Sequence, residues 1–169
     1  MITLRPMQAA PEDYRYMQRW FAEPELQQWV WCDEKGEGLV SLERIAEKYG
    51  ARAKRPTDVF PYFILCDGSP IGFIQYYLHS AGAVGLDMWI GVPGARSRGY
   101  GSEALRQMVT LIHRRHPGVR EVFIDPERGN LRAIRCYEKA GFQPEGEYTD
   151  ENDAVCVMMK IHFDKEASP

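Results

Sequence analysis

The run R-S-R-G-Y-G at residues 96–101 opens an amphipathic helical segment directly after an apolar, strand-like segment. Two glycines one residue apart allow the backbone to approach a ligand closely. The N–H groups in the first turn of a helix have no acceptor within the helix, and the positive end of the helix dipole lies behind them. A strand, a glycine turn and a helix start therefore predict a phosphate site. Arg96 and Arg98 add positive charge, so we expect a phosphorylated cofactor.

The composition predicts a single domain over residues 1–169. Hydrophobic residues make up 44% and charged residues 27%, which is ordinary for a globular protein with one sizeable core. The net charge of −3 argues against a general nucleic-acid binder. No apolar run approaches the ~20 residues of a membrane span, and the first residues lack the regions of a signal peptide. We therefore expect a cytoplasmic protein without nucleic-acid or membrane partners.

Cysteine and histidine usage gives no indication of a disulfide framework or a metal site. Cys32, Cys66, Cys136 and Cys156 are scattered and form no C-x-x-C pair, as in reduced cytoplasmic proteins. The four histidines form no H-E-x-x-H or similar cluster. We therefore predict that no metal is bound.

The hydrophobic periodicity changes along the chain from helical to strand-like and then alternates. It predicts, in order, a strand at 2–5, helices beginning at Pro11 and near Pro24, a helix at 41–49, a basic linker at 52–56, strands at 59–66, 71–78 and 84–92, a helix at 101–113, a strand at 119–124, a helix at 130–139, and a closing antiparallel pair at 142–147 and 155–163. This order predicts an α/β fold with a mixed, mostly antiparallel central sheet flanked by helices. One crossover, through the helix after the glycine turn, should be parallel and right-handed.

A second motif follows about thirty residues after the glycine turn. Residues 130–142 read N-x-x-A-x-x-x-Y-x-x-x-G-F, from Asn130 to Phe142. Together with R-x-x-G-x-G at 96–101 and the order of elements, this motif resembles the GCN5-related N-acetyltransferases. Several shorter stretches resemble one group within that superfamily, the aminoglycoside 6'-N-acetyltransferases. They are residues 4–7, 29–31, 60–62, 70–72, 85–87 and 125–142.

The resemblance implies that the cofactor is acetyl-CoA and assigns the residues that bind it. The backbone amides from Arg98 through Gly99, Tyr100 and Gly101 to Ser102 would wrap the pyrophosphate, with Arg96 and Arg98 beside it. The strand around Ile90 would separate from its neighbour and pair with the pantetheine arm, and the N–H near Ile90 would stabilise the oxyanion. Asn130 would bind the pantetheine amides.

Acetyl transfer to an amine also needs a group that takes a proton from the ammonium and one that assists the departing thiolate. Asp87 and Asp125 are the candidate bases, because each lies in or at the end of an apolar segment where an unpaired carboxylate is unfavourable. A cationic substrate would supply the missing partner. Alternatively, Asp87 faces water and Asp125 is an ordinary turn residue before Pro126. Tyr137 is the candidate acid, with packing in a helix as the alternative.

The expected substrate is a small polycationic amine, so its site should be acidic with aromatic walls. We predict that Trp31 and Tyr76 form walls and that Asp87, Asp125 and Glu151 contact the substrate. The dipeptide Glu151-Asn152 stands where the family that the chain resembles usually has an Asp-Gly turn, so the chain departs from the family pattern at this contact. The residues leave two other functions open. One is acylation of a siderophore precursor, polyamine or protein amine, and the other is a non-catalytic acyl-CoA-binding module. Either a monomer or a homodimer is compatible with the sequence.

Overall fold

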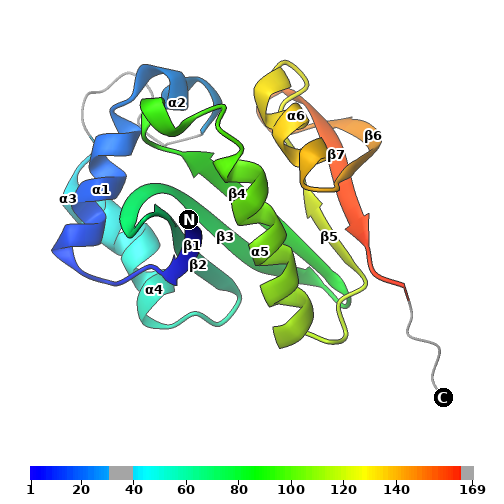
Figure 1. The fold of residues 1–169 in the computed structure, drawn as a ribbon, viewed down its shortest axis with the longest axis horizontal. Helices are drawn as coiled ribbons and strands as arrows, with labels where there is room; N and C mark the ends of the chain where they lie inside the picture. The colour runs from blue at the N-terminus through cyan, green and yellow to red at the C-terminus, as the bar shows by residue number, and fades with distance from the viewer. Residues whose placement is uncertain (31–39, 165–169) are drawn as a thin grey trace.

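A seven-stranded sheet runs through the molecule in the order β1-β2-β3-β4-β5-β7-β6 (Figure 1). The computed structural model describes residues 1–30 and 40–164. The strands are β1 (Ile2–Pro6), β2 (Val59–Cys66), β3 (Ser69–Ser80), β4 (Ala83–Ile90), β5 (Glu121–Ile124), β6 (Gln143–Thr149) and β7 (Val155–His162). The main helices are α1 (Pro11–Phe21), α2 (Pro24–Trp29), α3 (Leu42–Ile45), α4 (Ala51–Lys54), α5 (Tyr100–Arg115) and α6 (Leu131–Lys139). A π-helical turn (Ala46–Gly50) joins α3 to α4, and a 3-10 turn (Pro93–Ala95) precedes α5.

Strands β1 to β4 form an antiparallel meander. The turn between β2 and β3 contains Asp67 and Gly68, both with positive φ (48° and 82°). Positive φ at both central residues is the conformation whose twist matches a two-residue hairpin. The Asp-Gly turn therefore fixes the pairing of Cys66 with Ser69 next to it, and a register shift between Ile64 and Leu65 then sets the pairs farther along, such as Phe63 with Phe73.

The only parallel pair among the described strands is β4 with β5, connected through α5 as the sequence predicts. This pairing covers only Ala83–Gly85 of β4, whereas β4 remains paired with β3 as far as Ile90. Beyond Gly85, β4 and β5 separate, and no described strand pairs with the edge of β4 from Leu86 to Ile90 that faces away from β3. The sheet thus opens on one side of its centre.

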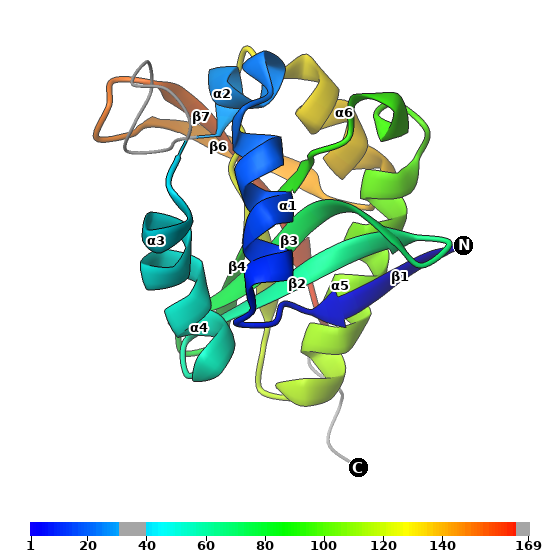
Figure 2. The same ribbon diagram turned by 90° about the vertical axis from the view of Figure 1, so that its left-hand side faces the viewer.

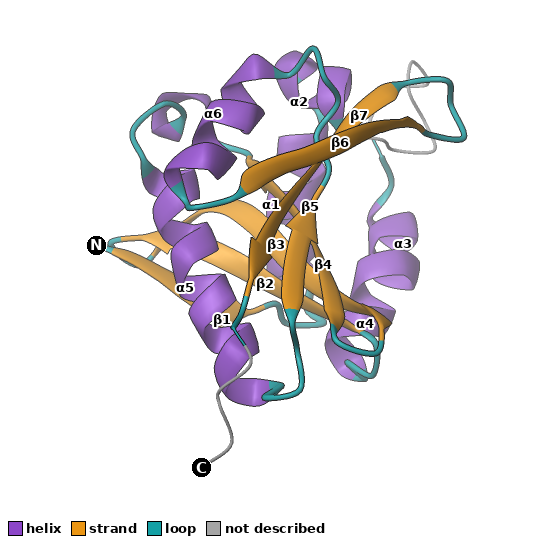
Figure 3. Ribbon diagram, turned by 90° about the vertical axis from the view of Figure 1, so that its right-hand side faces the viewer, coloured by secondary structure: helices purple, strands orange, loops and turns teal. Residues whose placement is uncertain are grey.

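Helices cover both faces of the sheet (Figures 2 and 3), and each face has its own hydrophobic core. On one face, α5 and α6 pack against β3, β4 and β5 around fully buried residues such as Leu105, Met108 and Phe142. On the other face, α1, α2 and α3 pack around a second core that contains Met17 and several aromatic residues, among them Trp20. Both faces of the central strands are therefore apolar, as expected for a sheet with helices on each side.

The largest difference from the predicted elements lies between residues 41 and 56. The helix expected at 41–49 continues to Lys54, so the first part of the predicted basic linker is helical. Ser41 caps this helix by accepting a hydrogen bond from the Arg44 N–H at 3.2 Å. The guanidinium of Arg52 lies over the Tyr49 ring, 5.4 Å from its centroid. Packing of this cationic side chain on an aromatic face favours the additional turn. No helix in the described ranges is long and apolar enough to cross a membrane.

Candidate functional site

A pocket of about 630 Å³ lies where the sheet opens, between β4, the start of α5, α6 and α2. Most of the residues predicted to bind a cofactor line it, namely Ile90, Arg96, Gly99, Gly101, Ser102, Asn130 and Tyr137. Arg98 is exposed beside the pocket, and Tyr100 packs against the main core. Arg132, Arg135 and Lys139 of α6 add positive charge to the wall. The pocket therefore combines an open strand edge, a helix start and cations.

The start of α5 depends on both glycines of the turn. Gly99 is the residue that caps α5 and has φ 81°, a conformation that residues with side chains rarely adopt. Gly101 faces the pocket wall, where an added Cβ would lie 2.9 Å from Cys136 Sγ and 3.2 Å from Met88 Cε. The first-turn amides of α5 have no acceptor in the helix. The missing side chain at Gly101 lets the start of α5 pack closely against Cys136 and Met88 in the pocket wall.

The exposed edge of β4 presents backbone groups to the same pocket. The Gly91 N–H donates to the Ile71 carbonyl at 2.8 Å, on the β3 side. Hydrogen bonds alternate along an antiparallel pair, so the N–H of the preceding Ile90 points away from β3 and toward the open edge. The Ile90 carbonyl also lies on that edge, where it accepts from Arg96 Nε at 3.0 Å. An extended ligand can therefore pair with β4 as an additional strand.

Arg96 lines the pocket and also makes contacts within the protein that the sequence does not predict. Its guanidinium holds the carbonyls of Ile90 (3.0 Å) and Gly91 (3.4 Å) and donates to Glu25 Oε2 at 2.6 Å. Glu25 in α2 also forms an ion pair with Arg132 of α6. Arg96 and Glu25 thus fix the end of β4 and link α2 to α6 across the pocket, so Arg96 supports the wall of the site.

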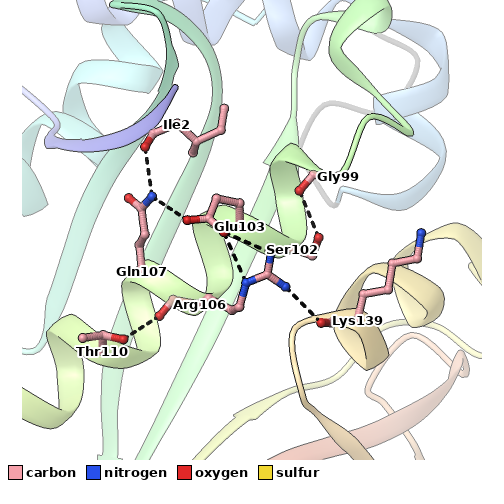
Figure 4. A network of polar contacts seen from close by, with 8 residues as sticks. All are labelled: Ile2, Gly99, Ser102, Glu103, Arg106, Gln107, Thr110 and Lys139. Carbon is pink, nitrogen blue, oxygen red and sulfur yellow. Dashed lines mark hydrogen bonds and ion pairs between the residues drawn. The ribbon is translucent and has the colours of Figure 1, made fainter.

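A polar network fixes α5 against α6 and β1 (Figure 4). Arg106 donates to the Lys139 carbonyl at 3.1 Å, at the end of α6. Gln107 donates to the Ile2 carbonyl of β1 at 2.9 Å. The Ser102 hydroxyl donates to the Gly99 carbonyl at 2.9 Å, within the turn that begins α5. The helix start is therefore held rigidly at one end of the pocket.

Asn130 caps α6 and lines the pocket. Its side-chain oxygen accepts from the Ala133 N–H at 3.3 Å, as expected for an N-cap residue. The amide NH₂ of Asn130 is not used by this cap and is available to a ligand carbonyl. One side chain thus starts the helix and presents a donor to the pocket.

Asp87 lies inside the fold on β4, opposite Gln75 of β3. Its Oδ2 accepts from Gln75 Nε2 at 2.8 Å, and Gln75 Oε1 in turn accepts from Arg52 at 3.3 Å. Burial raises the pKa of Asp87, and the charge of Asp125 raises it further, against the opposing effect of the Gln75 hydrogen bond. An incompletely paired carboxylate inside a fold is suited to binding a cation or taking a proton.

Asp125 directly follows β5 and is partly buried. Its Oδ2 accepts a short hydrogen bond from the Tyr148 hydroxyl. Burial raises the pKa of Asp125, and the Tyr148 hydrogen bond acts in the opposite direction. The charge of Asp125 contributes to the raised pKa of Asp87, so the two predicted bases lie near each other. Neither carboxylate is among the described residues that line the pocket itself.

Tyr137 of α6 is 7% exposed and lines the pocket. Burial raises the pKa of Tyr137, and the charges of Asp87 and Asp125 contribute in the same direction. The phenol therefore remains protonated at neutral pH and can act as a donor. Beside it, burial raises the pKa of the Cys136 thiol to about 11, which argues against Cys136 as a nucleophile.

Three predicted wall or contact residues do not join this group. Tyr76 is fully buried on the face covered by α5, where its hydroxyl lies 3.1 Å from His116 Nε2, so its prediction as a substrate wall is wrong. Glu151 is exposed in the turn between β6 and β7, and no contact with the pocket is found for it among residues 1–30 and 40–164. Trp31 lies outside the described residues. Nearby Trp29 does line the pocket.

Sequence reasoning missed several residues around the two carboxylates. Gln75 and Tyr77 of β3 lie on the same face of the sheet as Asp87 of β4. Gln75 donates a hydrogen bond to Asp87. Burial raises the pKa of Tyr77, and the charge of Asp87 raises it further. Gln75 could have been found, because it is the one amide in the apolar run from Ile71 to Tyr77. Tyr148 gave no such signal, since it lies in an exposed strand. Within the described ranges, no group of three or more His, Cys, Asp and Glu side chains can hold a metal ion.

The open sheet, the exposed β4 edge and the glycine-bounded helix start define an acyl-transferring enzyme of the N-acetyltransferase type. The chain belongs to the acetyltransferase (GNAT) domain family, whose model matches residues 9–149. The predicted family and fold class are confirmed.

Among similar sequences is an aminoglycoside N(6')-acetyltransferase type 1 from Klebsiella pneumoniae, 29% identical over 94% of this chain and 82% of that protein. A kanamycin resistance protein from Rhizobium radiobacter is 35% identical over 47% of this chain and 72% of that protein. The solved structure of AAC(6')-Ib with paromomycin and acetyl-CoA has a TM-score of 0.80 and 29% identity, covering 95% of this chain and 93% of that one. A spermidine N-acetyltransferase from Vibrio cholerae, 16% identical with a TM-score of 0.77 and coverage of 95% of each chain, shares the fold.

Proposed function

We propose that this protein transfers the acetyl group of acetyl-CoA to the 6'-amine of aminoglycoside antibiotics and thereby confers resistance to them. The observation that carries the proposal is that Tyr137 lines the pocket and that the carboxylates of Asp87 and Asp125 lie close enough for their charges to raise the pKa of Tyr137. A polycationic amine supplies the charge that these carboxylates lack, and similarity to aminoglycoside acetyltransferases extends over 94% of the chain. The 169 residues act as one domain in the cytoplasm.

In this proposal the first-turn amides of α5 bind the pyrophosphate of CoA, as helix N-termini bind phosphate. The free edge of β4 from Leu86 to Ile90 pairs with the pantetheine arm, and Asn130 donates to one of its amides. Arg98 and the cations of α6 neutralise the phosphates. The thioester then lies at the end of the pocket near Tyr137.

The transfer proceeds by direct attack. Asp87 and Asp125 bind the substrate ammonium and accept its proton, which leaves a neutral amine. The amine nitrogen attacks the thioester carbonyl, and the Ile90 N–H stabilises the oxyanion that forms. The C–S bond breaks as the carbonyl re-forms, and Tyr137 donates a proton to the leaving thiolate. The attacking nitrogen releases its second proton in the same collapse, and this proton restores the Tyr137 phenol. The product is an amide, and no covalent enzyme intermediate is formed.

The test uses purified protein, acetyl-CoA and a panel of amines, with thiol release as the readout. The panel contains kanamycin-type aminoglycosides, an aminoglycoside with a hydroxyl at the 6' position, polyamines and siderophore precursors. We expect turnover with the 6'-amines and none with the 6'-hydroxyl compound, and mass spectrometry should show one acetyl group per product. Turnover restricted to polyamines or siderophore precursors would assign a different acceptor. Binding of acetyl-CoA without turnover of any amine would indicate a non-catalytic module.

A further inference from the structure

The structure holds the two carboxylates in different ways. Asp87 is bonded by an amide, Gln75, whose own oxygen is fixed by Arg52. Asp125 is bonded by a phenol, Tyr148, from a strand at the edge of the sheet. The second oxygen of Asp125 receives no hydrogen bond from another residue in the part of the chain that the structure describes. One oxygen of Asp125 is therefore anchored and the other remains available.

Strand pairing places Tyr148 beside Asp125. The segment after β5 continues along β7, because the Val157 N–H donates to the Pro126 carbonyl at 2.9 Å and Glu127 forms a bridge with Cys156. On the other side of β7, Cys156 is paired with Tyr148 of β6. The Tyr148 side chain thus crosses β7 to reach the carboxylate. The hairpin β6–β7 positions this contact independently of Asp87 and Gln75.

We propose that Tyr148 is a positioning residue, which holds Asp125 in its ionised form with one oxygen directed toward the substrate ammonium. The proposal rests on the proposed function for the identity of that ammonium. A hydrogen bond to an ionised carboxylate is stronger than one to a neutral carboxylic acid, so a donor such as the Tyr148 hydroxyl favours the ionised form of Asp125. Tyr148 remains a donor at neutral pH, because burial and its bond to Asp125 raise its pKa.

Other titratable groups also face Asp125. They are Asp87 on β4, Tyr77 and His79 on β3, Tyr137 on α6, Asp150 in the turn after β6, and Cys156 on β7. The charge of Asp150 raises the pKa of Asp125, and His79 acts in the opposite direction. Tyr148 is the side-chain donor on the carboxylate, so its hydroxyl is the group whose removal isolates the effect.

The test is Tyr148→Phe, with Tyr16→Phe as the matched control. The first variant keeps the ring on its exposed strand and removes the hydroxyl. The control removes a phenol hydroxyl from α1, where the Tyr16 ring packs on Trp20 and Phe63. In the apo protein, NMR titration of ¹³C-labelled aspartate carboxyls, assigned with Asp125→Asn, reports ionisation directly. We expect the pKa of Asp125 to rise by about one unit in Tyr148→Phe and not in the control.

Kinetics supplies the second readout. The acid limb of kcat/KM for the aminoglycoside should move to higher pH by about the same one unit, while KM for acetyl-CoA stays unchanged. In the wild type, the Tyr148 ring carbon that bears the hydroxyl should titrate at the pH of the Asp125 carboxyl. The proposal would be overturned if the pKa of Asp125 were unchanged in Tyr148→Phe. It would also be overturned if the chemical shift of the Tyr148 ring carbon did not change at the pH where the Asp125 carboxyl titrates. Absence of wild-type turnover would refute the proposed function alone, because the NMR titration needs no substrate.

Discussion

Replacing Asp87 with asparagine separates the role of its charge from its role in packing. Asparagine has nearly the same shape, and its side-chain oxygen can accept the same bond from Gln75 Nε2 that Asp87 accepts at 2.8 Å. Weakening this bond from a charged to a neutral acceptor loses about 1 kcal/mol. Removing the charge of the half-buried Asp87 returns more, because taking a carboxylate out of water costs several kcal/mol, which the charges of Arg52 and Lys48 offset only in part. The raised pKa of Asp87 agrees with this expectation, because it means that the surroundings of Asp87 favour the neutral form.

We therefore expect Asp87→Asn to be more stable than the wild type at pH 7 and nearly inactive. A gain of about 1 kcal/mol corresponds to a Tm roughly 2–4 °C higher in a chain of this size. Loss of a group that takes the substrate proton should lower kcat/KM for the amine by about 10²–10⁴, while KM for acetyl-CoA remains the same. Thermal denaturation and thiol release measure the two effects on one preparation.

The pH dependence of stability gives an independent test of whether Asp87→Asn is more stable than the wild type. Because the folded-state pKa of Asp87 is raised above its unfolded value of about 3.9, the folded protein holds this proton more tightly. The contribution of Asp87 is fully present below the unfolded pKa and is lost as the pH rises through the folded pKa. The stability difference between Asp87→Asn and wild type should thus grow from pH 4 upward. A variant that is less stable at pH 7, or that keeps full turnover, would refute this reasoning.

Three further substitutions test the framework of the site. Gly91→Ala should destabilise the fold by about 1–3 kcal/mol, because its Cβ would lie 2.1 Å from the Trp20 ring, whereas Gly94→Ala has open space and should leave the Tm unchanged; equal melting curves would contradict this packing. Asn130→Ala should lose about 1 kcal/mol with the α6 cap and raise KM for acetyl-CoA, and an unaltered KM would remove Asn130 from the cofactor site. Tyr137→Phe should lower kcat about tenfold or less without changing either KM, since a thiolate already leaves readily; unchanged kcat in steady-state assays would assign Tyr137 to packing alone.

Much of the fold could be predicted from the sequence because local signals agreed with the final pairing. The Asp67-Gly68 turn joins β2 to β3 as a hairpin, and the glycine turn at 96–101 precedes the helix that connects the parallel pair. The helical extension through Arg52 was missed, because its charged residues resemble a linker. There, packing of the guanidinium on Tyr49 favours a helix that local composition does not indicate.

The candidate site was only partly predictable, for two physical reasons. Alternation along β3 places Tyr76 and Gln75 on opposite faces, but helices cover both faces, so periodicity alone does not tell which face carries the site. The aromatic ring of Tyr76 is suited to a wall of the substrate site, but it belongs to the core beneath α5. Tyr148 reaches Asp125 across a hairpin whose register shifts between Pro144 and Glu147. Such a contact depends on pairing that a single sequence does not specify.

The central claim is that the opening between β4 and β5, capped by the start of α5, holds acetyl-CoA beside two carboxylates. A crystal structure of the protein with CoA and a 6'-amine aminoglycoside tests this claim most directly. The account predicts the pyrophosphate on the backbone N–H groups of residues 98–102, the pantetheine along Leu86–Ile90, and the 6'-nitrogen between Asp87 and Asp125. A CoA molecule bound elsewhere, or an aminoglycoside whose 6'-nitrogen contacts neither carboxylate, would contradict it.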